Sequence, residues 1–270
     1  MSFALTEQYE PAPFIGAPPT IATPVTVDDR NYEVLLARTQ SEIDAALRLR
    51  FEVFNLELSE GLDSSFRTGR DRDEFDDTCE HLIAIDRSSG QVVGTYRLRT
   101  IEQARTAEGF YSFAEFDLGS MPRWMMDQSV ELGRACIARS HRNRRVLFLL
   151  WKGLAQYAAA RQKRFLFGCC SLNSQDPQDG IDLLQQFTDA GHLHPTLILP
   201  VQPDFACRSE VNALPDPSVE IPRLLSAYLG MGAKVCSPPA IDRRFKTIDF
   251  LIHFDTRSRH PRARRIFGKG

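Results

Sequence analysis

Two groups of acidic residues could transfer a proton or bind a cation. Glu131 lies in the stretch 130–139 (VELGRACIAR), which predicts a β-strand. The alternation of a strand places Glu131 and Gly133 on one face, where a carboxylate could act as a general base. The alternative is a structural ion pair between Glu131 and Arg134 near the end of the strand. The residues alone leave both interpretations open.

The second acidic group lies in the polar loop 59–77, where Asp73 and Asp76 are three residues apart. The loop is rich in both signs of charge, so a solvated charged turn is the simplest interpretation. We prefer that interpretation for three neighbouring acids: Asp71, Asp77 and Glu80.

A basic turn at residues 140–145 (SHRNRR) precedes a predicted helix and contains no glycine. The start of a helix is an unfavourable place for arginine, because the helix dipole is positive there. We therefore expect an external anionic partner to contact this turn, and a solvated basic loop is the alternative.

The composition is that of an ordinary globular protein, with 43% hydrophobic and 25% charged residues. A net charge of −2 argues against a general nucleic-acid binder. The six cysteines form no C-x-x-C pair, so we expect no metal site and a reducing, cytoplasmic location. The longest apolar stretch, residues 146–160, is too short to span a bilayer, and the N-terminus lacks the pattern of a secretion signal.

The order of elements predicts one mixed α/β domain over residues 31–255. We expect a Pro-rich, disordered tail at 1–30 and a basic tail at 256–270. Helices are expected at 42–58, with Ser41 as N-cap, and at 146–162, 178–190 and 220–230. Strands are expected at 32–38, 81–86, 91–100, 130–139, 164–172, 193–201 and 247–255.

Three motifs occur in order along the chain: residues 50–54 (RFEVF), 71–77 (DRDEFDD) and 131–134 (ELGR), with 94–98 (GTYRL) between the last two. Together they resemble the core of acyl-homoserine-lactone synthases. The resemblance to the ornithine-lipid N-acyltransferases, also called hemolysin-like GNAT proteins, is closer. It covers in addition residues 109–118, 150–155, 166–169 and 222–236, and so extends over about residues 32–255.

This resemblance implies a GNAT-like fold, with a central, mostly antiparallel sheet flanked by helices. It also implies N-acyl transfer, in which a nearby base assists attack by the amine, typically by about 10²–10⁴-fold. The resemblance favours Glu131 as that base. It groups Asp73 and Asp76 with Glu131 as catalytic residues, which either recognise the substrate amine or lock the loop through Arg50 and Arg97. The substrate-binding positions that it implies are Arg50, Phe54, Arg97 and Arg134, whose guanidinium groups could bind a carboxylate.

The tetrahedral oxyanion would be stabilised by backbone N–H groups near residues 136–138. Cys136 is expected in the core, because no histidine has motif spacing to it and direct transfer needs no covalent intermediate. Tyr157 could protonate the leaving thiolate, but we expect it to be a packing residue.

The basic turn also bears on the acyl donor. Many coenzyme-A-dependent relatives have a Gly-rich turn for the pyrophosphate at this place. An acidic acyl carrier protein, with its phosphopantetheine thioester, is therefore the expected donor and partner, and no bound cofactor is expected. The residues expected to bind it are Arg139, His141, Arg142, Arg144 and Arg145.

The expected reaction moves a (3-hydroxy) fatty acyl group to the α-amine of ornithine or a similar amino acid and gives a lyso-ornithine-type lipid. An acyl-homoserine-lactone synthase is the alternative enzyme, although the tryptophan that follows the position of Phe54 in those enzymes is missing. A non-catalytic lipid-binding or hemolysin-like protein is the alternative from another class. The basic C-terminal segment could hold the protein at the inner face of an anionic membrane, at roughly 1 kcal/mol per basic residue. A disordered basic tail is the alternative.

Overall fold

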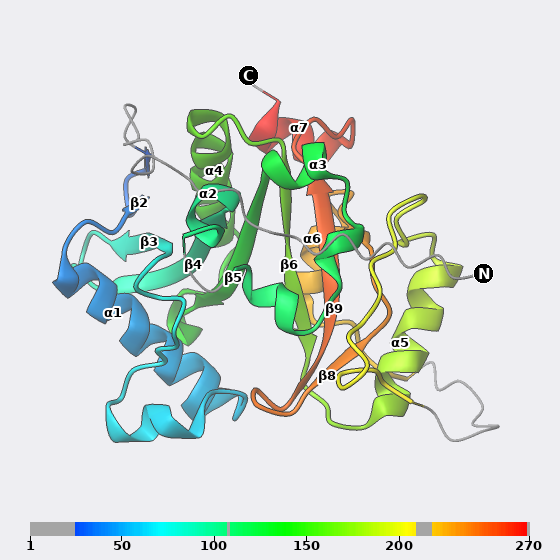
Figure 1. The fold of residues 1–270 in the computed structure, drawn as a ribbon. Coiled ribbons are helices and arrows are strands. Elements are labelled where there is room, and N and C mark those ends of the chain that lie inside the picture. The colour runs from blue at the N-terminus through cyan, green and yellow to red at the C-terminus, as the bar shows by residue number, and fades with distance from the viewer. Residues whose placement is uncertain (1–24, 107–108, 209–217, 269–270) are drawn as a thin grey trace, which may run out of the picture.

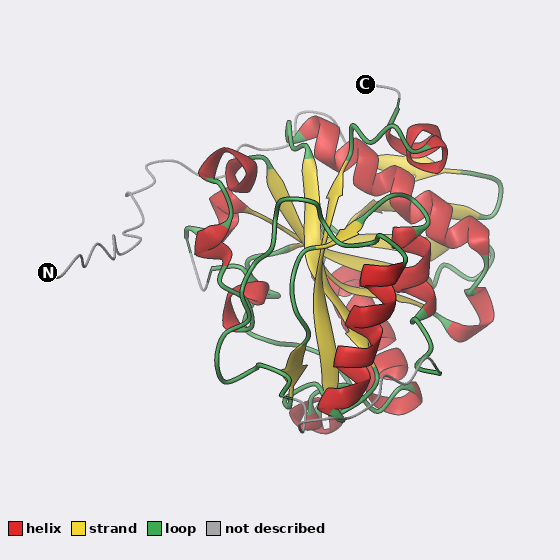
Figure 2. Ribbon diagram, turned by 90° about the vertical axis from the view of Figure 1, so that its right-hand side faces the viewer, coloured by secondary structure: helices red, strands yellow, loops and turns green. Residues whose placement is uncertain are grey.

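A twisted β-sheet runs through the protein, with helices against both of its faces (Figures 1 and 2). The computed structural model describes residues 25–106, 109–208 and 218–268. Within these residues the strand order is β1-β2-β3-β4-β5-β6-β9-β7, and β8 pairs with β9. The pairing is antiparallel except between β5 and β6, which confirms the predicted sheet. The strands are β1 (Thr26–Asp28), β2 (Tyr32–Leu36), β3 (Glu80–Asp86), β4 (Val92–Thr100), β5 (Ser129–Ile137), β6 (Phe165–Leu172), β7 (Lys234–Val235), β8 (Ala240–Asp242) and β9 (Thr247–Asp255).

The helices divide between the two faces of the sheet. One face packs against α4 (Arg144–Ala160), α5 (Pro177–Asp189), α6 (Arg223–Leu229) and α7 (Pro261–Phe267), which share the largest hydrophobic core. The other face carries α1 (Gln40–Arg50), α2 (Ile101–Ala104) and α3 (Arg123–Asp127), with smaller clusters of buried residues. Short helical turns complete this second face: η1 (Phe51–Glu57), η2 (Asp63–Arg67), η3 (Tyr111–Ala114) and η4 (Leu118–Ser120).

Strands β5 and β6 pair over only three residues and then part. Their parallel ladder ends where Glu131 faces Phe167, whereas β5 stays paired with β4 as far as Ile137. Gly168 lies just beyond the last pair, and a Cβ atom there would be 2.1 Å from the carbonyl oxygen of Leu132. Only glycine allows so close an approach of the two backbones. The close contact between the two strands directly before they part therefore requires a residue without a side chain.

The first helix differs from its prediction at both ends. Thr39, and not Ser41, is the N-cap, and it forms a capping box with Glu42. The helical path continues to Glu57, close to the predicted end, but its last seven residues form the π-helical turn η1. Such turns are rare and are frequent at functional sites.

Most predicted elements are confirmed, but residues 193–201 do not form a strand. The segment is irregular and joins the sheet through single contacts, such as the bond from Leu199 N–H to the Cys236 carbonyl at 2.7 Å. Pro195 and Pro200 interrupt it, and proline cannot donate a hydrogen bond to a ladder. The apolar pattern of the segment reflects burial of Leu197 and Leu199 rather than a strand.

Both predicted tails contribute to the folded structure. Residues 1–24 of the N-terminal tail lie outside the described residues, but Thr26–Asp28 form β1 and pair with β2. At the other end, α7 buries Ala263, and its Phe267 ring lies 5.1 Å from that of Phe254. Ile266 and Phe267 pack against the core. Among the described helices, none combines the length and the hydropathy that a membrane span requires.

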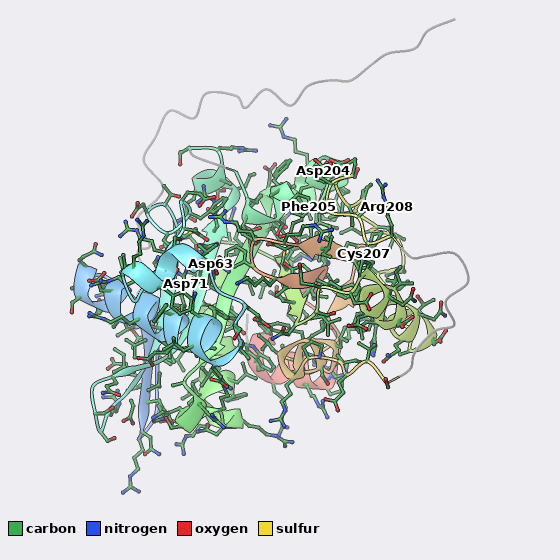
Figure 3. All side chains as sticks on the ribbon, turned by 90° about the horizontal axis from the view of Figure 1, so that it is seen from below. Asp63, Asp71, Asp204, Phe205, Cys207 and Arg208 are labelled. Carbon is green, nitrogen blue, oxygen red and sulfur yellow. The ribbon has the colours of Figure 1, made fainter. Side chains whose placement is uncertain are left out.

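A buried ion network ties α1 to the loop that precedes β3. Arg50 is fully buried in the last turn of α1, where its Nε donates to Asp71 at 2.8 Å and its Nη1 to Asp76 at 2.6 Å. Asp71 is also fully buried and lies beside α1 (Figure 3). The prediction of a solvated turn is therefore wrong at Asp71, because its charge is neutralised inside the protein.

The parting of the two strands can be tested by substituting Gly168. We expect Gly168→Ala to lower the free energy of unfolding by about 1–3 kcal/mol, the usual cost of forcing extra volume into a packed interior. Gly133→Ala is the matched control, because the nearest atom to a Cβ there is 3.9 Å away. Urea unfolding followed by circular dichroism measures both variants. Equal stability of the two would contradict the close approach at Gly168.

The ion network can be tested at Arg50. Arg50→Met leaves Asp71 and Asp76 buried with less positive charge, and removing one partner of a buried pair typically costs about 3–5 kcal/mol. Arg70→Met is the control, because the pair between Arg70 and Asp44 is partly exposed and should contribute less than about 1 kcal/mol. Urea unfolding again gives both values, and a similar loss in the two variants would argue against the network.

Candidate active site

A cavity of about 1110 Å³ lies where β5 and β6 part. Side chains from both faces of the sheet line it, so the opening between the strands joins two halves of different character. The half toward α4 and α6, which we call the apolar chamber, includes Leu147, Trp151, Leu154, Leu225, Tyr228 and Phe267. The half toward η1 and η3, which we call the polar chamber, includes Glu60, Arg97, Tyr111, Glu131, Arg134 and Asp249.

Glu131 lies in the polar chamber and is the last residue of β5 that pairs with β6, next to the point where the two strands part. Its Oε1 accepts hydrogen bonds from the N–H (2.8 Å) and the hydroxyl (2.6 Å) of Ser112, and its Oε2 accepts one from the N–H of Tyr111 (2.9 Å). Burial raises the pKa of Glu131, and these hydrogen bonds oppose the rise only in part. A carboxyl group with a raised pKa is better matched to accept a proton near neutral pH.

Two arginines bring positive charge into the polar chamber. Nη1 of Arg97 lies 2.5 Å from Asp73 and 3.2 Å from Asp76, and Nη2 of Arg134 lies 3.1 Å from Asp73. Burial acts to raise the pKa of Asp73, but the charges of Arg97 and Arg134 outweigh it and hold the pKa below its ordinary value. The aspartates are therefore ionised, and they compensate the arginines. Arg134 pairs with Asp71 and Asp73, so the ion pair between Glu131 and Arg134 that was the alternative interpretation is not formed.

Arg134 adopts a strained backbone conformation. Its φ of 49° lies in the left-handed region, at the irregularity where β4 and β5 change register. The guanidinium carbon is 3.9 Å from the centre of the Phe245 ring and 6.0 Å from that of Phe54. Such strain costs on the order of 1–3 kcal/mol and clusters at functional sites. It holds a cation between aromatic walls inside the cavity.

The predicted site residues form two layers. The inner layer lines the cavity and consists of Phe54, Arg97, Glu131 and Arg134. The outer layer consists of Arg50, Asp73 and Asp76, which contact one another or the inner arginines and do not line the cavity. Residues of the inner layer can touch a substrate, whereas those of the outer layer position them.

The predicted donor-binding residues also differ in their environment. Arg142 pairs with Glu57, Arg145 pairs with Asp29, and His141 lies 3.1 Å from the Tyr32 hydroxyl. Arg139 and Arg144 are exposed and have no ion-pair partner among the described residues, and Arg144 lines the mouth of the cavity. Asn143 caps α4 by accepting from the N–H groups of residues 145 and 146.

Cys136 lines the cavity but is not a nucleophile at neutral pH, and Tyr157 lies outside the cavity. Cys136 is buried, and burial raises its pKa to about 12, so it stays a thiol at neutral pH. The Tyr157 hydroxyl donates to Glu80 at 2.6 Å, and the side chain does not line the cavity.

Sequence analysis did not assign Ser112, Glu115 or Asp249 to the site. A signal was present for Asp249, because it is an acid within an otherwise apolar strand, residues 247–255 (TIDFLIHFD). Glu115, Cys169 and Asp249 bring their potential ligand atoms within 4.8 Å of one another, the one such group with metal-ligating side chains in the described chain.

Comparison with known proteins identifies the family. Residues 49–152 match the family described as Acetyltransferase (GNAT) domain. The L-ornithine N(alpha)-acyltransferase of Agrobacterium fabrum is 33% identical over 241 residues, which cover 82% of this chain and 79% of that protein. The enzyme of the same name from Rhodobacter capsulatus is 33% identical over 260 residues, which cover 89% of this chain and 98% of that protein.

Two solved structures are also similar, at low sequence identity. The AHL synthase LasI gives a TM-score of 0.48 at 12% identity, covering 88% of this chain and 95% of that one. FeeM, an N-acyl amino acid synthase from uncultured soil microbes, gives a TM-score of 0.46 at 11% identity, and the match covers 90% of this chain and 96% of that one. The identity and coverage of the named relatives decide the assignment: the chain belongs to the L-ornithine N(alpha)-acyltransferase family and is an amino-acid N-acyltransferase.

Proposed function

We propose that the enzyme transfers a (3-hydroxy) fatty acyl group from acyl carrier protein to the α-amine of ornithine or a similar amino acid. The observation that carries this proposal is one cavity whose apolar and polar chambers lie on either side of the opening between β5 and β6, which begins next to Glu131. A fatty acyl chain and a charged amino acid need opposite surroundings, yet their reacting atoms must come within about 3–3.5 Å of each other. The names of the relatives support ornithine as the acceptor.

In the proposed reaction the thioester carbonyl lies in the opening between β5 and β6. The α-ammonium group gives one proton to Glu131, and the neutral nitrogen attacks the carbonyl carbon. As the intermediate collapses, the C–S bond breaks, the second proton leaves nitrogen and the thiolate is protonated. Glu131 returns its proton to solvent. There are two products. One is the N-acyl amino acid, which is a lyso-ornithine-type lipid, and the other is the free phosphopantetheine thiol.

The groups that stabilise the oxyanion are proposed to be backbone N–H groups of β5. The N–H of Ala138 is already bonded to the Val93 carbonyl at 2.8 Å, so the far end of the expected segment is occupied. The edge of β5 toward β6 loses its ladder partner directly after Glu131, within the described residues. Donors that follow Glu131 are therefore better placed to meet the oxyanion. Arg134, which lies between aromatic rings in the same chamber, is the proposed partner of the amino-acid carboxylate.

The carrier protein is proposed to dock at the start of α4. Arg142 and Arg145 are already paired with Glu57 and Asp29, so the charge available to an acidic partner comes mainly from Arg139 and Arg144. Arg142, Asn143 and Arg144 line the cavity at this end, where a phosphopantetheine arm would enter.

Contact with an anionic membrane, at the cytoplasmic face, is a further part of this proposal. Arg262, Arg264 and Arg265 are exposed on α7, while Ile266 packs inward. Such a contact would rest on charge rather than on an inserted apolar tip.

The proposed base can be tested by Glu131→Gln. With 3-hydroxyacyl carrier protein and ornithine, we expect kcat to fall by about 10²–10⁴-fold, the usual contribution of a general base. Mass spectrometry measures the N-acyl product, and circular dichroism checks that the variant is folded. Glu102→Gln is the matched control, because Glu102 pairs with Lys163 outside the cavity, and it should keep the wild-type kcat.

The pH dependence separates a base from a residue that only positions the η3 turn. Wild-type activity should fall as the pH drops through the raised pKa of Glu131, because the protonated acid cannot accept a proton. The deficit of Glu131→Gln should shrink as the pH approaches the pKa of the substrate amine, which then arrives neutral. A deficit that is equal at every pH would remove Glu131 as the base.

No N-acyl product with any amine, from folded protein and a verified donor, would refute the proposed function.

The proposed docking of the carrier protein can be tested with the double variant Arg139→Ala/Arg144→Ala. We expect the KM for acyl carrier protein to rise about tenfold, with kcat retained at saturation, because the lost contacts steer and hold the partner. The effect should be smaller at high salt. Arg123→Ala on α3 is the control, because this arginine is 83% exposed and lies away from the cavity. An equal rise in both variants would exclude docking at α4.

A further inference from the structure

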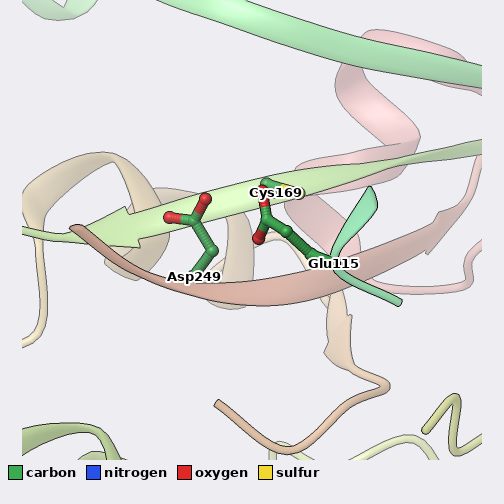
Figure 4. A group of neighbouring side chains, drawn as sticks. All are labelled: Glu115, Cys169 and Asp249. Atoms are coloured by element: carbon green, nitrogen blue, oxygen red, sulfur yellow. The ribbon is translucent and has the colours of Figure 1, made fainter. Parts of the chain in front are cut away.

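Three carboxyl groups lie in or beside the polar chamber, and none of them has a lysine or arginine partner among the described residues. They are Glu60, which follows η1, Glu115, which follows η3, and Asp249 on β9, and we call them the acidic pocket. Glu115 is 1% exposed and Asp249 is 3% exposed. Figure 4 shows the carboxyl groups of Glu115 and Asp249 close together beside Cys169. Glu60 and Asp249 line the cavity.

The acidic pocket differs from every other buried acid cluster in the described residues. Asp71, Asp73 and Asp76 each contact an arginine. In contrast, no lysine or arginine of the described residues forms an ion pair with Glu115 or Asp249. These two carboxyl groups contact each other and neutral hydroxyl groups, and neither oxygen of Glu115 makes a well-formed hydrogen bond in the described structure. An ionised carboxylate is costly to bury without a positive partner, so buried carboxyl groups that share a site either bind a proton or accept a cationic ligand.

The protonation behaviour of the pocket agrees with this geometry. Burial, together with the Asp249 charge, raises the pKa of Glu115 well above its ordinary value. Burial raises the pKa of Asp249 to about 6 and that of Glu60 to about 7. A positive ligand would stabilise the ionised form of all three.

The pocket lies close to the proposed base. Ser112 donates to Glu131 at 2.6 Å, and its Oγ is 3.5 Å from Sγ of Cys169, which itself lies within 4.8 Å of the Glu115 and Asp249 carboxyl groups. An extended chain of five single bonds, as between the two amines of ornithine, spans about 6 Å. A diamino acid can therefore reach from Glu131 into the acidic pocket.

We propose that the acidic pocket binds the side-chain ammonium group of the acceptor and so selects basic amino acids over neutral ones. This inference rests on the proposed function, because it takes the α-amine to be the nucleophile beside Glu131. A metal ion is the competing occupant. Cys169 is held as a thiol by its buried surroundings, whereas metals bind thiolates, so the pocket suits an ammonium group better.

The test compares ornithine with norvaline, which has the same carbon chain but lacks the side-chain amine. For the wild type, we expect kcat/KM for ornithine to exceed that for norvaline by about 30-fold or more, the effect of removing one partner of a buried charge pair. Asp249→Asn should lower kcat/KM for ornithine by a similar factor and leave norvaline nearly unchanged. Glu115→Gln is the second variant should the first not fold.

The matched control is Asp182→Asn. Asp182 on α5 is 2% exposed, accepts a hydrogen bond from Gln178 at 2.7 Å and does not line the cavity. This variant should keep the preference for ornithine. Equal kcat/KM for ornithine and norvaline in the wild type would overturn the proposal that the acidic pocket binds the side-chain ammonium group. The acyltransferase function would remain intact.

Binding without turnover separates the two proposals. If folded protein and verified donor give no N-acyl product, the proposed function fails, and calorimetry with ornithine and norvaline still tests the pocket. Tighter binding of ornithine, lost in Asp249→Asn, would support it, and equal binding would overturn it. A rise in Tm with zinc that Cys169→Ala removes, together with no preference for ornithine, would assign the pocket to a metal and also overturn the proposal.

Discussion

The parting of β5 from β6 is the constraint on which the site depends. A sheet normally separates its two faces completely, because neighbouring strands are only about 4.8 Å apart. Here an opening between β5 and β6 connects the two faces in the middle of the sheet. On their other edges, β5 stays paired with β4 and β6 stays paired with β9. The opening is thus built into a rigid element and not into a loop, which suits a reaction that needs fixed geometry.

Around this opening the protein treats buried acids in two ways. The acids of the loop before β3 are neutralised by arginines, and the result is a stiff support for Arg97 and Arg134. The acids near β9 are left without such partners, and the cost of their burial is not offset within the described chain. The first arrangement holds the inner arginines in place, and the second is the site proposed for the ammonium group of the acceptor. The contrast between them carries more information than the presence of acidic residues alone.

The sequence predicts the central elements well because their signals are local. Alternation identifies β9, whose bounds match the expectation, and the apolar period identifies α4 to within two residues at each end. Local signals fail where tertiary contacts decide. Residues 193–201 look like a strand because Leu197 and Leu199 are buried, and α7 looks like a tail because its outward face is basic.

The composition of the site was predictable, but its layering was not. The motifs bring together Arg50, Arg97 and Glu131, yet only the fold decides which side chains reach the cavity. The same limit applies to the basic turn, since Arg142 and Arg145 pair with acids 85 and 116 residues away in the sequence. Pairings over such distances leave no periodic or spacing signal.

The last helix has a consequence for how such an enzyme can diversify. Phe267 lines the apolar chamber and packs on Phe254, so the volume open to an acyl chain is set partly by the final described residues. This helix packs mainly against α4 and lies on the opposite face of the sheet from Glu131 and Asp249. Under the proposed function, substitutions there would change the preferred acyl length without disturbing the polar chamber, so the two specificities would evolve separately.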